Sequence, residues 1–97
     1  MAGLRAVSAD VWGATADVTN ASDVERFVTE AASALGRVDI VVCNVGGSFG
    51  GPSLEASDED WMNTLDINLL HSVRTIRAAL PHMKESGGGR VAIVSSI

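Results

Sequence analysis

The feature that most constrains the fold is a short apolar run that ends in a loop rich in glycine. Ile40, Val41 and Val42 are followed by Asn44 and then by four glycines within residues 46–51. A run of branched apolar residues of this length is typical of a strand buried on both faces of a parallel sheet. Glycines after such a strand let a ligand approach the backbone, because no Cβ stands in the way. The pattern predicts a buried strand that delivers its carboxyl end to a ligand crevice.

Helical periodicity on both sides of this strand predicts two helices. Gly36 is the expected left-handed stop of the first helix, and its expected N-terminal cap is either Ser22 or Asn20. Ser57 is the expected cap of the second helix, where three carboxylates favour the positive end of the helix dipole, and Pro81 is expected to interrupt it. The apolar stripes are Val24, Phe27, Val28, Ala31 and Leu35 in the first helix and Leu65, Leu69, Val73, Ile76 and Leu80 in the second.

Two further runs predict strands at the two ends of the chain. Residues 11–16 contain the β-prone Val11 and Trp12, and residues 90–95 contain the apolar run that begins at Val91. The predicted order is β-α-β-α-β, with short connections. This order indicates an α/β fold with a parallel sheet.

Composition and charge exclude several classes of function. The formal net charge of -5, with only seven Lys and Arg residues, argues against binding to nucleic acid. No apolar run reaches the roughly 18 residues of a membrane-spanning helix, so we expect no membrane partner. Cys43 is the single cysteine and has no metal-ligand neighbours at a useful spacing, so we expect no metal site. A reducing cytoplasm is the simplest location for such a chain.

Four short motifs together indicate a family. Cys43-Asn44-Val45-Gly46 resembles the Asn-Asn-Ala-Gly motif that ends the fourth strand of the classical short-chain dehydrogenases/reductases. Asp17-Val18-Thr19 lies upstream, Asp66-Ile67-Asn68-Leu69 lies downstream, and Ser95-Ser96 follows the last predicted strand. The motifs occur in the order of the family and at about its spacing, so the resemblance covers almost the whole chain.

The resemblance implies a Rossmann-like doubly wound parallel sheet with strand order 3-2-1-4-5-6-7. In that order, only the strands at residues 40–42 and 91–94 of this chain would be neighbours. It also implies an NAD or NADP site. Asp17 and the Val18 backbone would hold the adenine, and Asn44, Val45 and Gly46 would border the ribose and pyrophosphate side.

For catalysis, the resemblance implies roles for Asn68 and Ser96. Asn68 would distort its helix locally and bind a water molecule of the proton relay to the catalytic lysine. Ser96 would hydrogen-bond the carbonyl or hydroxyl of a small alcohol or ketone substrate. The family's long helix, which corresponds to residues 58–80, commonly forms a dimer face within tetramers, so a homo-oligomer is the expectation for the parent protein.

Each of these residues also has an ordinary structural interpretation. Asp17 suits a turn before a helix, and Ser96 suits the turn after a strand. Asn68 has poor helix propensity and lies one step off the Leu65 stripe, so it is expected to face buried surface as a hydrogen-bonded amide. His71 and His82 are expected to be packing or surface residues rather than an acid and base pair.

Two motifs that the family's chemistry needs do not occur in these 97 residues. They are the nucleotide-binding TGxxxGxG turn and the catalytic YxxxK segment, and the chain contains no tyrosine. We therefore expect residues 1–97 to form one partial NAD(P)-binding Rossmann-fold domain, truncated at both ends, that is inactive alone. The alternatives are a noncatalytic α/β module that binds a nucleotide, or an interaction fragment that docks on a full-length paralogue.

Overall fold

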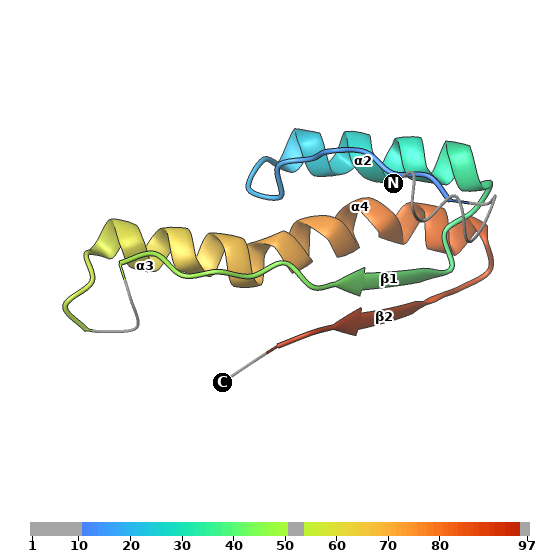
Figure 1. The fold of residues 1–97 in the computed structure, drawn as a ribbon. Coiled ribbons are helices and arrows are strands. Elements are labelled where there is room, and N and C mark those ends of the chain that lie inside the picture. Colours follow the sequence, from blue (N-terminus) through green and yellow to red (C-terminus); the bar gives the residue numbers. More distant parts are fainter. Residues whose placement is uncertain (1–10, 51–53, 96–97) are drawn as a thin grey trace.

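Two helices packed side by side cover one face of a two-stranded sheet (Figure 1). The computed structural model describes residues 11–50 and 54–95. The elements are the helix α2 (Ala21–Leu35), the strand β1 (Ile40–Cys43), the helix α3 (Asp58–Leu65), the π-helix η1 (Asp66–Leu70), the helix α4 (His71–Glu85) and the strand β2 (Arg90–Ile93). Helices α3, η1 and α4 follow one another without a break and form one long rod (Figure 1).

The helix ends are fixed by the residues that the sequence identifies as caps. The side chain of Asn20 accepts a hydrogen bond from the Asp23 N–H at 3.0 Å, so Asn20 rather than Ser22 caps α2. Gly36 ends α2 with φ of 88°, the left-handed conformation that glycine adopts without strain. Ser57 accepts from the Asp60 N–H at 3.1 Å and caps α3.

The two strands pair in parallel, as expected. Ile40 lies opposite Arg90, and Cys43 lies opposite Ile93. The Arg90 N–H donates to the Asp39 carbonyl at 2.8 Å, and the Val94 N–H donates to the Cys43 carbonyl at 2.9 Å. Because the rod of α3, η1 and α4 connects them, β1 and β2 form the β-α-β part of the predicted fold.

The core lies where α2 packs on α4. Phe27 and Val41 pack against this core, and the Trp12 ring lies 5.2 Å from the Phe27 ring. None of the helices within residues 11–50 and 54–95 is long and apolar enough to cross a membrane. The buried core residues are Val24, Val28, Ala79 and Met83.

The predicted strand at residues 11–16 is wrong. These residues are neither helix nor strand, and they run alongside α2 (Figure 1). A strand needs a neighbour for its backbone hydrogen bonds, and the sheet of the described residues consists of β1 and β2, neither of which pairs with this segment. The described architecture is therefore α-β-α-β.

The prediction that the strands are buried on both faces is also wrong. Ile40 is 69% exposed and Val42 is 60% exposed, and only Cys43 of β1 is buried. The reason is that helices cover a single face of the sheet, and the second face needs a layer from another segment. Cys43 itself is 3% exposed, so this small residue fills space between the strand and the helices.

The second helix packs with a different face from the one that its apolar stripe indicated. The residues of α4 that are buried are His71, Ser72, Ala79 and Met83, and α4 continues through Pro81 to Glu85. Leu65, Leu69, Val73 and Leu80 are exposed, between 40% and 55%. Helix α4 packs on α2, and the leucine stripe remains uncovered.

Candidate functional site

The side chain of Asn68 joins the long rod to the glycine loop after β1. Its Oδ1 accepts a hydrogen bond from the Gly47 N–H at 3.2 Å, and its Nδ2 donates to the Gly47 carbonyl at 2.5 Å. The amide therefore pairs with both backbone groups of Gly47, as a neighbouring strand would. The same Nδ2 donates to the Thr64 carbonyl one turn earlier at 2.7 Å. We refer to these contacts as the Asn68–Gly47 bridge.

The helix that carries Asn68 is locally distorted, as expected. Residues Asp66–Leu70 form a π-helix, in which the His71 N–H donates to the Asp66 carbonyl five residues back. The His71 Nδ1–H donates to the Ile67 carbonyl at 2.6 Å, so a side chain satisfies this carbonyl within the distortion. Few α-helices contain a π turn, and those that do often carry it at a functional site. The distortion turns Asn68 toward the glycine loop.

Asn68 does not lie on buried surface, contrary to the expectation. It is exposed, and both hydrogens of its side-chain amide are nevertheless donated in hydrogen bonds. The stripe of Leu65 and Leu69, one step from Asn68, is itself exposed, so the neighbouring position is exposed as well. The interpretation of Asn68 as a hydrogen-bonded amide is confirmed.

Gly46 has no side chain because the bridge occupies the space beside it. A Cβ at Gly46 would lie 2.9 Å from Asn68 Oδ1, closer than carbon and oxygen atoms normally approach. At Gly47 the nearest atom to such a Cβ would be Ile67 Cδ1 at 3.9 Å, an ordinary contact. The Phe49 N–H donates to Thr64 Oγ1 at 3.1 Å and adds a second connection between this loop and α3. The rod thus holds the loop at Gly47 and at Phe49.

Asp17 forms a tight turn before α2. Its Oδ1 accepts from the Thr19 Oγ1–H at 2.7 Å and from the Thr19 N–H at 2.9 Å, and its carbonyl accepts from the Asn20 N–H. The hydroxyl and then the amide of Thr19 hold the pKa of Asp17 below its ordinary value, because they stabilise the ionised carboxylate. The turn interpretation is confirmed, and the exposed carboxylate remains ionised at neutral pH.

Three of the predicted cofactor-binding residues share one cavity of about 280 Å³. Val18 lines it from the segment before α2, and Asn44 and Val45 line it from the end of β1. His71 lies at the same cavity and is buried, with its Nε2 3.3 Å from Ser72 Oγ. His71 is thus a packing residue, one of the two roles expected for it. Its position at the cavity of Val18 and Asn44 was not predicted.

The structure separates the remaining predicted residues. Asp17 does not line the cavity of Val18 and Asn44, and Gly46 lies with Asn68 at the bridge. Ser96 lies outside the described residues. Ser95, which precedes it, is exposed after β2.

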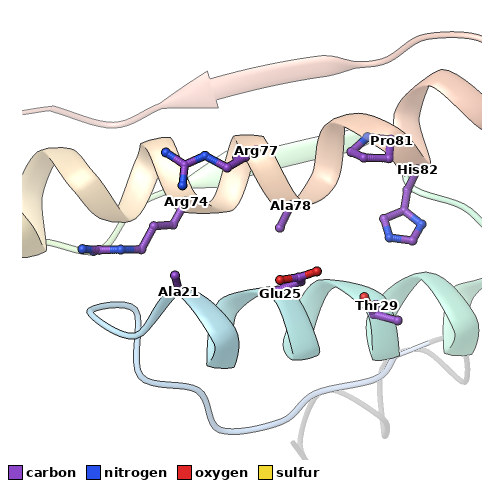
Figure 2. A pocket seen from close by; sticks show the side chains of 8 residues that line it. All are labelled: Ala21, Glu25, Thr29, Arg74, Arg77, Ala78, Pro81 and His82. Atoms are coloured by element: carbon purple, nitrogen blue, oxygen red, sulfur yellow. The ribbon is translucent and has the colours of Figure 1, made fainter.

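A second opening lies between the two long helices (Figure 2). Its volume is about 370 Å³, with Ala21, Glu25 and Thr29 of α2 on one side. Arg74 and His82 of α4 lie on the other side, and both were absent from the predicted site. Within residues 11–50 and 54–95, no three His, Cys, Asp or Glu side chains are grouped so that they could hold a metal ion.

Comparisons with known proteins give one consistent result. A family model described as short chain dehydrogenase matches residues 1–97. An uncharacterized NAD-dependent oxidoreductase of Mycobacterium tuberculosis is 36% identical over 97 residues, which cover 96% of this chain and 35% of that protein. The chain thus spans about a third of the length of the curated relatives it matches.

Two solved structures carry the same arrangement of elements. A short-chain dehydrogenase from Streptomyces avermitilis superposes with a TM-score of 0.82 at 29% identity, over 97% of this chain and 35% of that one. A 7α-hydroxysteroid dehydrogenase in complex with NADH and 7-oxo glycochenodeoxycholic acid gives a TM-score of 0.76 at 29% identity, over 84% of this chain and 31% of that one.

The Asn68–Gly47 bridge gives a first testable prediction. Asn68→Ala removes Oδ1, the acceptor of the Gly47 N–H, together with both Nδ2 donations. We expect the Gly47 amide to exchange its hydrogen faster and the chain to lose about 1 kcal/mol of stability. Asn63→Ala, at an exposed asparagine of α3, is the matched control and should leave the Gly47 amide unchanged. Equal effects of the two variants would show that the bridge has no role in holding the loop.

The turn at Asp17 gives a prediction about pH. A carboxyl group with a lowered pKa in the fold stabilises it at higher pH, and this contribution is lost as the pH falls through the folded pKa. Thr19→Ala removes the hydroxyl that contributes most to the lowering. We expect the pKa of Asp17, measured by NMR titration of its carboxyl carbon, to rise toward its ordinary value in Thr19→Ala and to stay unchanged in Thr29→Ala. An unchanged pKa in Thr19→Ala would contradict the assignment of its cause.

Proposed function

Because the chain belongs to the short-chain dehydrogenase/reductase family, we propose that it supplies the central part of an NAD- or NADP-dependent oxidoreductase. The reaction is hydride transfer between the cofactor and a secondary alcohol or ketone. The observation that carries the proposal is the π turn that presents Asn68 to the glycine loop. It supports the family role, since the family's relay asparagine lies in a local distortion of the same helix.

The adenosine half of the cofactor fits the residues at the end of β1. Asn44 and Val45 face the cavity that Val18 also lines, and Gly46 follows them in the chain. The ionised Asp17 carboxylate accepts hydrogen bonds, which suits an adenine amino group. When bound, the nicotinamide ring donates or accepts the hydride. In this proposal, residues 17, 18 and 44–46 orient the adenosine half only.

The apolar part of the same cavity indicates what the rest of the protein supplies. Ala14, Ala16 and Val42 line it, and the strand order of the family places two further strands between residues 11–16 and β1. Those strands would form the floor of the cofactor site. The chain alone is therefore expected to bind a nucleotide weakly, because it supplies only the edge of the cofactor site.

The side chain of Asn68 can accept one further hydrogen bond, from a water molecule of the relay. Both hydrogens of its Nδ2 are donated to carbonyls, and Oδ1 accepts only one of the two bonds that it can take. A water molecule of the relay would donate to this oxygen. Ser96, three positions after Ile93 at the end of β2, would polarise the substrate oxygen, and the general acid would come from outside the chain.

Further properties of the parent protein are part of the same proposal. The substrate is a small-molecule alcohol or ketone, and the protein assembles as a homo-oligomer. A cytoplasmic location is proposed on the single cysteine, which is free and buried.

The uncovered leucine stripe favours a second candidate function, an interaction fragment. Leu65, Leu69 and Leu80 are between 45% and 55% exposed on the face of the rod. Exposed apolar rows of this kind mark interaction sites. A full-length short-chain dehydrogenase is the proposed partner, because such helices pair in the family's oligomers.

The cofactor assignment predicts which half of the dinucleotide the chain contacts. We expect adenosine monophosphate at millimolar concentration to shift the NMR amide signals of residues 17–19 and 44–46, and nicotinamide mononucleotide to leave them unchanged. Asp17→Ala should weaken the response. A response to the nicotinamide half alone would contradict the assignment.

The same sample is expected to show no turnover of alcohols with NAD or NADP, because no tyrosine is present to act as the general acid. Turnover by a preparation of verified mass would contradict the proposal that catalysis needs segments outside the chain.

The interaction candidate predicts the effect of a charge on the stripe. Leu69→Asp should abolish co-purification with a full-length family member, since it places a carboxylate in the apolar contact. Asn63→Asp, on the same rod, is the control and should leave co-purification intact. Retained binding by Leu69→Asp would rule out the stripe as the contact surface.

A further inference from the structure

Arg74 holds two separate parts of the candidate site with one side chain. Its Nη1 donates to the Val18 carbonyl at 3.1 Å, across 56 positions of sequence. Its Nη2 donates to Asp66 Oδ1 in an ion pair. Figure 2 shows the side chain on the α2 side of α4, near Ala21 where α2 begins. The side chain of Arg74 is 17% exposed and that of Asp66 is 25% exposed, so solvent competes little for these contacts.

The two acceptors belong to the two halves of the site. Val18 follows Asp17 in the turn on the proposed adenosine side. Asp66 is the first residue of the π turn, two positions before Asn68. The planar guanidinium presents donors in a rigid fork, so its contact with one acceptor fixes its orientation toward the other. A shift of the Asp17 turn therefore changes the hydrogen bond that Arg74 donates to Asp66, the first residue of the π turn.

We propose that Arg74 is a positioning residue that couples the Asp17–Thr19 turn to the Asn68–Gly47 bridge. It touches neither cofactor nor substrate and acts through Val18 and Asp66. Order in the turn strengthens the bridge, and order in the bridge strengthens the turn by the same free energy, because coupling between two sites is reciprocal. The inference deepens the proposed function, but the coupling itself exists without a ligand.

The test is a double-mutant cycle read at one amide. The Gly47 N–H reports the bridge, since it donates to Asn68 Oδ1. Thr19→Ala loosens the turn by removing a hydrogen bond to Asp17. We expect Thr19→Ala to speed hydrogen exchange at Gly47 about fivefold in the otherwise unchanged chain, as expected from one hydrogen bond of ordinary net strength. In the Arg74→Met background, Thr19→Ala should have no further effect.

Arg77→Met is the matched control. Arg77 lies on the same helix and lines the same opening between α2 and α4, and it is exposed. The effect of Thr19→Ala on Gly47 should persist in the Arg77→Met background. Arg74→Lys keeps the charge without the fork and should restore the coupling only in part.

A second amide distinguishes loss of the coupling from a general loss of structure. The Val94 N–H donates to Cys43 in the sheet and should exchange at the same rate in all variants. Persistence of the Thr19→Ala effect in Arg74→Met, or equal acceleration at Gly47 and Val94, would overturn the proposal. If Arg74→Met does not fold, Asp66→Asn, which weakens one arm of the fork, replaces it in the same cycle with the same expected and contrary results. The cycle contains no nucleotide, so its failure is distinct from a failure of the cofactor assignment.

Discussion

The packing of α2 on α4 is the contact on which the other features depend. Ala79 is 1% exposed at the centre of this contact, and its small side chain lets the two helices approach each other. Val24, Val28 and Met83 complete the core around it. With α4 fixed, β1 and β2 lie against it at one end, and the π turn faces the glycine loop at the other (Figure 1). The site is therefore positioned by a core that contains none of the predicted site residues.

Local signals in the sequence were sufficient for features that are stabilised locally. Gly36 and Ser57 end and begin helices as expected, because each acts through bonds within a few residues. The parallel pairing of the two strands followed from the family's strand order. The position of Asn68 in a distorted helix also came from the resemblance, since no periodicity rule places a π turn.

Features that depend on distant partners were not predictable in this way. Residues 11–16 have the composition of a strand and lack a strand neighbour, so their preference is overridden. Ile40 and Val42 have the pattern of buried residues, and the layer that would bury them is not part of the described residues. The role of Arg74 could not be predicted from the sequence. One of its acceptors is 56 positions away and is a backbone carbonyl, which every residue has.

The register of the sheet also has a geometric consequence for the segments that follow the two strands. Cys43 pairs with Ile93, so Asn44 and Val94 leave the sheet at the same level. One residue of a strand advances the chain by about 3.3 Å, and a slip by one residue turns every side chain to the opposite face. The offset between the segment after β1 and the segment after β2 is thus set in whole residues by backbone pairing. No change of side-chain rotamer compensates for a wrong register.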